Sequence, residues 1–374
     1  MLCIACMMPC MSCANKEKSP LAETGDERED EQSGPDSLSI LVAGDLMQHS
    51  PQINAALTKN GYNYDACFEL EKPVISDADI AIANFEVTLG GPPYKGYPCF
   101  SAPDEYLHGI LNAGFDVLTT GNNHCLDSRQ KGLERTIQIM DSLKVPHLGT
   151  YKDSLERTKN YPLLIEKNGF RVVLLNFTYA TNGLRVTKPN IVNYIDTMQI
   201  ADDIAKAKTM QPDLLIAIPH WGIEYALTPN KPDRELADWL FAKGVDHIIG
   251  GHPHVLQPME RRNATAANGG NVLVYSLGNY ISNQYKDNTV GGAMVRLDFV
   301  KQDGKVKLVN CGYMLTYCSR PQSSGKKNYR IVPVEMDSVL NQQDRNIRDK
   351  FLRTANNLFD KHNVNFGKYK KTSK

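Results

Sequence analysis

The stretch Ser39-Ile40-Leu41-Val42-Ala43-Gly44-Asp45 joins a continuous apolar run to an abrupt acidic end. An apolar run of this length without alternation predicts a β-strand that is buried on both faces. Gly44 allows the backbone to turn sharply and to present the carboxylate of Asp45. The stretch therefore predicts a strand of an α/β domain with a potential metal ligand at its carboxyl end. Taken alone, Asp45 is better explained as a turn or helix-capping aspartate.

Four further apolar runs end in the same manner, in carboxylate, amide or imidazole side chains. They are residues 79–83 before Asn84-Phe85-Glu86, 115–120 before Gly121-Asn122-Asn123-His124, 214–219 before His220, and 247–251 before His252-Pro253-His254. In open α/β sheets, ligands bind beyond the carboxyl ends of the strands. We therefore expect the polar ends of five strands to gather at one edge and to form a dinuclear metal site.

The segment that ends the third run carries three kinds of functional group in seven residues, Gly121 to Asp127. Asn123 offers a neutral amide oxygen to a metal, and His124 beside it can face a substrate. Asp127 can orient and charge the imidazole of His124, which then serves as a general acid. The alternative is that Asn123 and Asp127 cap the helix that follows and that His124 only packs.

The carboxylate and imidazole that end the second and fourth runs each allow two interpretations. Glu86 ends a buried strand, where a carboxylate must be paired, protonated or metal-bound; otherwise it is a surface glutamate at the start of a loop. His220 is a metal ligand or a structural histidine. Glu224, four residues later, is either a partner that holds the other nitrogen of the His220 ring or a surface charge.

His252 and His254 are two residues apart. On an extended segment their side chains point the same way, so both can reach one metal cluster; the alternative is two independent histidines in a loop. Ser276 and Asn279 end another apolar run and are expected to line the same edge, unless they form a plain turn. Oxygen donors mixed with imidazoles favour Mn, Fe or Zn and disfavour a thiolate zinc site.

Composition is that of an ordinary folded protein. The 374 residues are 41% hydrophobic and 22% charged, and 42 Lys and Arg balance 42 Asp and Glu. A net charge of zero argues against an extended polyanion-binding surface, nucleic acid included, and leaves room only for local basic patches. No stretch approaches the roughly 20 apolar residues that a membrane-spanning helix needs.

The N-terminal residues 1–14 are apolar and contain Cys3, Cys6, Cys10 and Cys13. We interpret them as the end of a lipoprotein signal with Cys13, after the small Ser12, as the lipidated residue. This would place the body of the protein outside the bacterial cytoplasm, in the periplasm or at the cell surface, tethered to a membrane. The alternatives are a disordered reactive tail and, less well supported because no histidine accompanies the cysteines, a zinc cluster. Residues 15–37 are acidic and nearly free of apolar side chains, which predicts a disordered linker.

Residues 38–300 alternate strand runs with amphipathic patterns, which predicts one α/β domain. Helices are expected over 128–143, 200–210 and 233–243, and strands over 271–279 and 292–300. Hairpins are expected at Asn168-Gly169 and Asp303-Gly304, so the fold has a mixed sheet or two packed sheets. Residues 301–374 add a hairpin, a helix over 339–358 and a basic tail. Cys311 and Cys318 either pair across a hairpin or stay reduced.

In their order along the chain, these motifs resemble those of the CapA family. That family concerns bacterial poly-γ-glutamate and related capsules and belongs with the calcineurin-like metallophosphoesterases. The resemblance covers roughly residues 38–299 and rests on Gly44-Asp45-Leu46-Met47, Asn84-Phe85-Glu86, residues 121–127, residues 220–225, residues 251–257 and residues 276–280. It implies a four-layer α/β/β/α sandwich with mixed sheets and two divalent cations between loops of the two sheets.

Carried over by position, the resemblance also implies roles for single residues. The implied metal ligands are Asp45, Glu86, Asn123, His220, His252 and His254, with Glu86 as the bridging carboxylate. His124 would be the proton donor, supported by Asp127. The wider phosphoesterase pattern has a histidine two residues after the first aspartate, but this chain has Met47 there, and His49 need not replace it.

Two functions are consistent with this resemblance. The first is a metal-dependent hydrolase that cleaves a phosphoester or an amide during assembly of poly-γ-glutamate or another anionic cell-surface polymer. The second is a non-catalytic subunit that binds the polymer or the membrane-bound capsule synthase and keeps a vestigial metal site. Met47 favours the second function, whereas the group formed by Asn123, His124 and Asp127 favours the first.

Overall fold

Two β-sheets organise residues 36–371, the part of the chain that this computed structural model describes. The first sheet has eight strands in the order β18-β17-β16-β1-β4-β5-β6, with β15 paired to β1. The second has six strands in the order β13-β14-β12-β11-β9-β8. The predicted lipidation site at Cys13 and most of the predicted linker lie outside the described residues.

The first sheet is mixed. Its strands are β1 (Asp36–Leu46), β4 (Ile80–Phe85), β5 (Val117–Thr119), β6 (His147–Leu148), β15 (Asn279–Ile281), β16 (Gly291–Gln302), β17 (Lys305–Ser319) and β18 (Arg330–Pro333). The strand β1 runs parallel to β4 on one side and antiparallel to β16 on the other. The hairpin predicted at Asp303-Gly304 joins β16 to β17, and both of its residues have positive φ.

The second sheet is mixed as well. Its strands are β8 (Leu163–Lys167), β9 (Phe170–Thr178), β11 (Leu214–His220), β12 (His247–Ile249), β13 (Met259–Arg262) and β14 (Asn271–Val274). The hairpin predicted at Asn168-Gly169 joins β8 to β9 in antiparallel register. Strands β9, β11, β12 and β14 are parallel, so their carboxyl ends lie at one edge.

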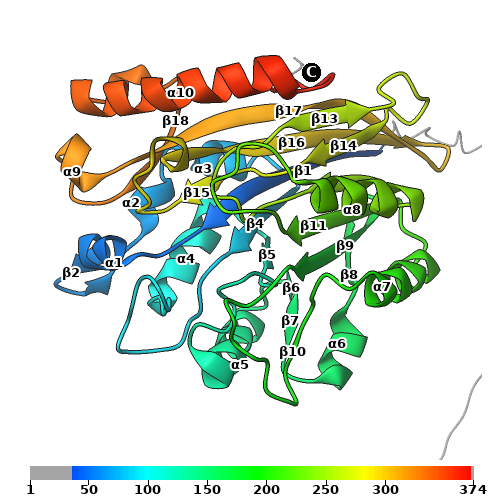
Figure 1. Ribbon diagram of the computed structural model, residues 1–374, viewed down its shortest axis with the longest axis horizontal. Coiled ribbons are helices and arrows are strands. Elements are labelled where there is room, and N and C mark those ends of the chain that lie inside the picture. Colours follow the sequence, from blue (N-terminus) through cyan, green and yellow to red (C-terminus); the bar gives the residue numbers. More distant parts are fainter. Residues whose placement is uncertain (1–35, 372–374) are drawn as a thin grey trace, which may run out of the picture. The chain divides into compact units, whose positions relative to one another are not determined.

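Helices cover the outer faces of both sheets. On the first sheet these are α2 (Asp65–Phe68), α3 (Lys72–Ile75), α4 (Asp104–Ala113) and α5 (Arg129–Ser142); on the second they are α7 (Thr197–Thr209) and α8 (Lys231–Ala242). The long α10 (Gln342–His362) lies along β17 in Figure 1. Short elements complete the chain: α1 (Ser50–Ala56), α6 (Ser154–Asn160), α9 (Pro321–Ser324) and the strands β2 (Leu57–Thr58), β3 (Gly61–Tyr62), β7 (Thr150–Tyr151) and β10 (Ile191–Val192). The predicted four-layer α/β/β/α sandwich is confirmed.

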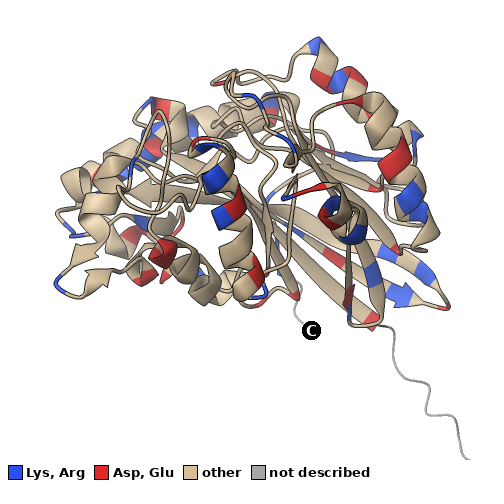
Figure 2. Ribbon diagram, turned by 90° about the horizontal axis from the view of Figure 1, so that it is seen from below, with Lys and Arg blue, Asp and Glu red and all other residues tan. Residues whose placement is uncertain are grey.

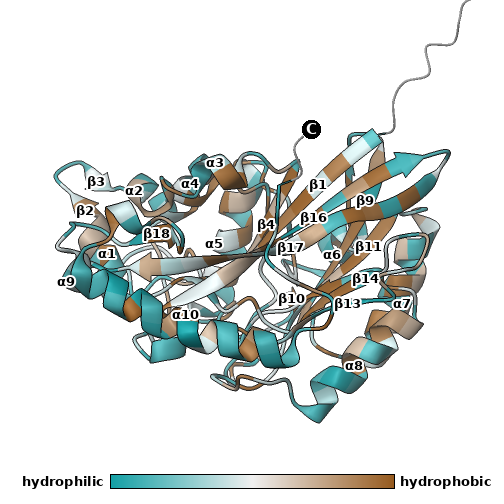
Figure 3. Cartoon of the chain, turned by 90° about the horizontal axis from the view of Figure 1, so that it is seen from above, coloured by the Kyte–Doolittle hydropathy of each residue, from teal (hydrophilic) through white to brown (hydrophobic). Residues whose placement is uncertain are grey.

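The apolar run of β1 is buried on both faces, as its sequence predicts. Ile40 and Val42 pack into the core between the two sheets, whereas Leu41 and Ala43 pack against the outer helices. Burying one such aliphatic side chain contributes about 1.5–3 kcal/mol, so these central strands carry a large share of the fold's stability. Figure 3 shows that the central strands β9 and β11 are hydrophobic, whereas α10 is largely hydrophilic.

The run from 271 to 279, predicted as one strand, is divided between the two sheets. Its first half is β14 in the second sheet, and its last residue begins β15 beside β1 in the first. The chain crosses between the sheets at Ser276 to Gly278, where Gly278 has a φ of 67°. A Cβ atom at Gly44 would lie 2.0 Å from the carbonyl oxygen of Gly278, so position 44 must be glycine for the crossover to pack against β1.

Cys311 and Cys318 lie on the same strand, β17, so the disulfide considered across a hairpin does not form. The cysteines of the described residues are all free. The C-terminal helix predicted over 339–358 is α10, shifted to 342–362. Within residues 36–371, no helix is both long and apolar enough to cross a membrane. Figure 2 shows basic and acidic residues interspersed along the ribbon, in keeping with their equal numbers.

Candidate metal centre

The ends of five strands converge between the two sheets. Asp45, Glu86 and Asn123 come from β1, β4 and the segment after β5 in the first sheet, and His220, His252 and His254 come from β11 and the segment after β12 in the second. Their donor atoms form two buried groups, Glu86–His220–His252 and Asp45–Glu86–His254, in each of which all atoms lie within 4.8 Å of one another. Glu86 belongs to both groups, as a bridging carboxylate would.

Glu86 lies at the middle of this cluster. Its Oε1 atom lies 3.6 Å from Nε2 of His220 and 3.6 Å from Nε2 of His254. Burial and then the negative charge of Asp45 raise the pKa of the Glu86 carboxyl well above its ordinary value. Two carboxylates this close in a buried site are stable only when cations or protons neutralise them.

Two atoms at the centre have no hydrogen-bond partner within the described part of the chain. They are Oε1 of Glu86 and Nδ1 of His252, and both are buried. Leaving such atoms without a partner costs free energy, so each one needs an explanation. Carboxylate oxygens and imidazole nitrogens are donors for Mn, Fe or Zn, and the unsatisfied atoms therefore fit a site for divalent cations.

The protonation states also suit metal binding. Burial followed by the charges of the neighbouring histidines lowers the pKa of His220 well below its ordinary value, and burial lowers the pKa of His252 to about 3. These rings are therefore neutral and keep a lone pair free. Burial by itself would raise the pKa of Asp45, but hydrogen bonds with His254 and Asn84 outweigh it and lower that pKa.

Asn84 organises the centre, a role that the sequence analysis missed. Its Nδ2 atom lies 2.8 Å from Oδ1 of Asp45, 3.0 Å from Oε2 of Glu86 and 3.3 Å from Nδ1 of His220. Its own Oδ1 accepts a hydrogen bond from Asn122. A usable signal was present, because residues two apart on a strand share a face and Asn84 precedes Glu86 by two.

The predicted proton-transfer pair is formed beside the cluster. Nδ1 of His124 lies 2.7 Å from Oδ2 of Asp127, and both side chains are buried. The same Asp127 oxygen accepts a hydrogen bond of 2.7 Å from the backbone N–H of Phe100, whose ring packs edge-on at 4.6 Å from that of His124. Asn123 lies next to this pair, with Oδ1 2.7 Å from Nε2 of His220.

A sixth segment, which follows β9, reaches the centre and was not predicted to. Oδ1 of Asn182 accepts a hydrogen bond of 3.2 Å from Nδ2 of Asn123. Tyr179 places its ring 4.4 Å from that of His252. The Asn182-Gly183 pair, with φ values of 49° and 74°, makes the turn that brings this segment back. In the sequence, the Asn182-Gly183 pair predicts a turn, but it does not predict that this turn lies beside the metal centre.

One argument from the sequence is wrong, and for Glu224 the structure supports the alternative of a surface charge. His252 and His254 do not lie on an extended segment, because their φ values are 101° and 60°; two left-handed turns, rather than strand alternation, bring both rings to the cluster. Glu224 is exposed and does not hold the His220 ring, whose Nδ1 lies beside Asn84 instead.

Ser276 and Asn279 support the centre from the crossover between the sheets. Ser276 Oγ donates to the carbonyl oxygen of Val255 and accepts from the N–H of Gly278, so it fixes the turn. Asn279 pairs in register with Asp45, and its Nδ2 donates to Gln284 and to the carbonyl oxygen of Thr289. Neither side chain is in the two metal-binding groups.

Met47 is buried and contributes no imidazole to the cluster. Its carbonyl oxygen accepts hydrogen bonds from Gln52 and from the hydroxyl of Tyr106. Nδ1 of His49 lies 3.1 Å from Oε1 of Gln52 and 3.2 Å from the backbone N of Asn283. That nitrogen of His49 is therefore engaged in fixing local structure.

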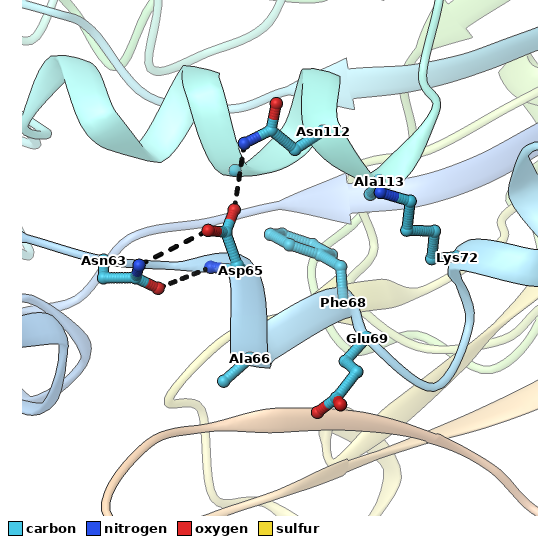
Figure 4. Close-up of a pocket in the computed structure, with 9 residues that line it drawn as sticks. Asn63, Asp65, Ala66, Phe68, Glu69, Lys72, Asn112 and Ala113 are labelled. Atoms are coloured by element: carbon cyan, nitrogen blue, oxygen red, sulfur yellow. Dashed lines mark hydrogen bonds between the residues drawn. The ribbon is translucent and has the colours of Figure 1, made fainter.

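A separate surface pocket of about 530 Å³ lies beside α2 and α4 (Figure 4). Its polar side chains mainly satisfy one another. Asp65 accepts hydrogen bonds from Asn112 at 3.0 Å and from Asn63 at 3.3 Å. None of the residues that form the two metal-binding groups lines this pocket.

Comparisons with known proteins identify the relatives of this chain. Residues 39–284 match the family model described as "Bacterial capsule synthesis protein PGA_cap". The capsule biosynthesis protein CapA of Bacillus anthracis is 30% identical over 275 residues, which cover 70% of this chain and 64% of that protein, less than two thirds of its length. The PGA biosynthesis protein CapA of Bacillus subtilis is 28% identical over 277 residues, with 71% and 69% covered.

Solved structures resemble the chain more distantly. The calcineurin-like phosphoesterase YfkN of Bacillus subtilis has a TM-score of 0.48 at 16% identity, over 87% of this chain and 98% of that chain. A putative 5′-nucleotidase of Staphylococcus aureus has a TM-score of 0.48 at 15% identity, over 85% and 58%. The match of the family model over most of the described residues identifies the chain as a member of the bacterial capsule synthesis protein family.

Proposed function

We propose that the protein is a metal-dependent hydrolase that acts on an anionic cell-surface polymer, poly-γ-glutamate or another, during capsule synthesis. One observation carries this proposal: Glu86 is shared by two buried groups of metal-binding side chains, and its Oε1 has no hydrogen-bond partner within residues 36–371. A purely structural cluster of carboxylates and imidazoles would satisfy these atoms internally. Two adjacent cation sites are typical of hydrolases that cleave phosphoesters and amides.

Six residues would hold the two cations: Asp45, Glu86, Asn123, His220, His252 and His254. Bound divalent ions of this type, Mn, Fe or Zn, supply Lewis acidity and lower the pKa of bound water. Asn84 fixes the orientation of two of these ligands, because its amide lies within hydrogen-bonding distance of both Asp45 and Glu86.

The pair His124 and Asp127 would transfer a proton to the leaving group. The Asp127 carboxylate selects the tautomer of His124 that carries its proton on Nδ1 and thereby orients the ring. To act as a general acid, the ring would start as the imidazolium and give its Nε2 proton to the leaving group, and it would end neutral with its remaining proton on Nδ1. A carboxylate next to that ring stabilises the charged form and so supports general acid catalysis.

Membership of the family supports a proposal for the substrate, the partners and the location of the protein. Its members concern capsule synthesis, so the proposed substrate is an anionic surface polymer or its precursor, and the proposed partners are subunits of a membrane-bound capsule synthase. The scissile bond would be a phosphoester or an amide. Lipidation of Cys13, outside the described residues, would tether the protein to a membrane outside the cytoplasm.

A second function is favoured by one observation. Met47 is buried where the wider phosphoesterase pattern has a histidine, and Nδ1 of His49 is engaged with Gln52. The chain therefore has one histidine ligand fewer than the wider phosphoesterase pattern. This favours a non-catalytic subunit that binds the polymer or its synthase.

Metal analysis of the purified protein, followed by turnover assays, separates these functions. We expect about two equivalents of Mn, Fe or Zn in the wild type and a loss of both in Glu86→Gln and His220→Ala. His108→Ala, at an exposed histidine of α4, is the matched control and should keep its metal. Bis(p-nitrophenyl) phosphate and a γ-glutamyl anilide test the two kinds of bond. Metal without turnover of either would favour the binding subunit, and a wild type without metal would refute the proposal.

A further inference from the structure

The exposed tyrosines of the described residues gather around the candidate metal centre. These are Tyr97, Tyr179, Tyr194 and Tyr285, with exposed fractions of 74%, 41%, 36% and 82%. Tyr97, Tyr179 and Tyr285 each lie on a segment that leaves a strand at the centre, namely β4, β9 and β15. Tyr194 joins them, because its hydroxyl lies 2.8 Å from Oγ1 of Thr181 on the β9 segment. Exposed rings on neighbouring segments offer apolar surface that a ligand can contact.

Tyr179 lies beside one of the two metal-binding groups. Its ring lies 4.4 Å from that of His252 and stacks at 6.5 Å over that of His220, both members of one metal-binding group. One face of the Tyr179 ring is thus covered by the two histidines. The exposed part of the same ring is available to a ligand that enters the centre.

Tyr225 lies beside the other metal-binding group and holds a cation there. Its ring lies 6.3 Å from that of His254, in the other metal-binding group, and Nζ of Lys286 lies 3.5 Å from the ring centroid. The attraction between the ammonium and the ring fixes Lys286 near the centre. Tyr285 directly precedes Lys286 in the chain and so belongs to the same segment.

Tyr97 connects this surface to the predicted proton donor. Its ring lies 6.4 Å from that of Phe100, which in turn packs at 4.6 Å against the ring of His124. We define Tyr97, Tyr179, Tyr225, Tyr285 and Lys286 as the tyrosine rim. Members of the rim lie next to each metal-binding group and, through Phe100, next to the proton donor, so a ligand on the rim lies close to the groups proposed for hydrolysis.

We propose that the tyrosine rim binds the sugar rings of an anionic polysaccharide, an inference that rests on the proposed function and names its substrate class. The apolar C–H face of a sugar ring stacks on an exposed aromatic ring, and the tyrosine hydroxyl can hydrogen-bond to the sugar hydroxyls. Lys286 pairs with a carboxylate or phosphate on the polymer. A polyglutamate chain has no rings to stack on three exposed tyrosines and would be better matched by several free cations.

The arrangement favours a polymer over a nucleotide. The exposed rings come from separate segments, and Lys286 already covers Tyr225. Successive sugars of one chain can contact such separated rings. A single nucleobase is better held by two rings that face each other across a slot.

Two polycarboxylates of equal charge, oligogalacturonate with rings and oligo-γ-glutamate without them, test the proposal by isothermal titration to the full chain at low ionic strength. We expect oligogalacturonate to bind more tightly, and Tyr179→Ala and Tyr285→Ala each to weaken it roughly 3- to 10-fold. Tyr285→Phe should keep the affinity, because the ring remains. Met198→Ala, at an 80% exposed side chain of α7, is the control and should change nothing.

The same titrations carry the outcomes that would overturn the proposal. They are tighter binding of oligo-γ-glutamate, failure of oligogalacturonate to bind, unchanged binding in both tyrosine variants, and preferential binding of adenosine monophosphate through Tyr179. Glu86→Gln, titrated in parallel, separates this inference from the proposed function. It should lose metal yet still bind oligogalacturonate, whereas a wild type without metal that binds oligogalacturonate would refute only the hydrolase.

Discussion

Nδ1 of His124 lies 2.7 Å from Oδ2 of Asp127, and both side chains are buried at the edge of the candidate metal centre. The backbone N–H of Phe100 donates to the same carboxylate oxygen, so Asp127 is held from two directions. Neither residue belongs to the two metal-binding groups. The pair is therefore placed to act on protons without holding a cation.

His124→Ala should keep the bound metal and lose turnover by about 10²- to 10⁴-fold, the usual contribution of general acid catalysis. Asp127→Asn should have a smaller effect of the same kind, because the ring stays in place but its charged form is no longer stabilised. Metal analysis and initial rates on the same protein samples measure both effects. Loss of metal in His124→Ala would instead make His124 a ligand.

The strands and their polar ends could be predicted from the sequence because local patterns encode them. Asp45 and Glu86 each follow an apolar run whose length fixes a buried strand, and both reach the centre. The assignment of the apolar runs to one sheet or the other could not be predicted, because runs such as 40–43 and 214–218 look alike and nothing local in a strand identifies its partner.

Contacts that depend on distant segments were also beyond the sequence. Asn182 reaches Asn123 only through the path of the segment after β9. The crossover at Ser276 to Gly278 looked like the end of one strand, since each half is apolar. The positive φ of His252 and His254 was not expected, because two histidines two residues apart after an apolar run were interpreted as an extended segment.

Asn182 should control the orientation of the Asn123 amide. Asn182 Oδ1 accepts a hydrogen bond from Nδ2 of Asn123, which leaves Asn123 Oδ1 to face His220. Without this bond the amide can rotate and present its NH₂ group, which cannot bind a cation. Asn182→Ala should therefore weaken Mn²⁺ binding by about 10- to 100-fold, as other partners of metal ligands do.

Asn182→Asp is the matched variant, because it keeps the accepting oxygen. Titration calorimetry with Mn²⁺ should give this variant an affinity near that of the wild type. Equal Mn²⁺ affinity in Asn182→Ala and the wild type would show that the amide of Asn123 needs no such support.

Gly251→Ala should damage the centre more than the fold. A Cβ atom at this position would lie 2.9 Å from Oδ1 of Asp45, so the carboxylate must move. We expect Mn²⁺ affinity to fall at least about 10-fold while the melting temperature changes by only a few degrees. Gly367→Ala is the control, since a Cβ there meets nothing within 4 Å. A metal affinity in Gly251→Ala equal to that of this control would contradict the role given to Asp45.

The proposed membrane anchor is tested by substituting Cys13, which lies outside the described part of the chain. If Cys13 is lipidated, Cys13→Ala should move the protein from the membrane fraction to the soluble one when the natural chain is expressed in bacteria. Cys10→Ala serves as the control and should leave the distribution unchanged. Membrane association that survives Cys13→Ala would refute lipidation at this residue.

Glu71 should make the stability of the protein depend on pH, independently of the metal centre. Its side chain is 1% exposed, its Oε1 has no hydrogen-bond partner within the described residues, and burial raises the carboxyl pKa to about 8 from 4.5. Below pH 4.5 both the folded and the unfolded chain carry the proton. Between pH 4.5 and about 8 only the folded chain keeps it, so this contribution to stability falls as pH rises, by at most about 1.4 kcal/mol per pH unit, and levels off above pH 8.

Glu71→Gln removes this titration and keeps the shape of the side chain. The variant should therefore be more stable than the wild type at pH 8, by about 1–3 kcal/mol, the usual cost of an unsatisfied buried polar group. The difference should shrink towards pH 5, because the wild-type carboxyl is then neutral in the folded chain and its ionisation in the unfolded chain adds little. Urea unfolding of both proteins at pH 5, 6.5 and 8 measures this trend. A difference that is constant across the three pH values would show that Glu71 is ionised in the folded protein throughout.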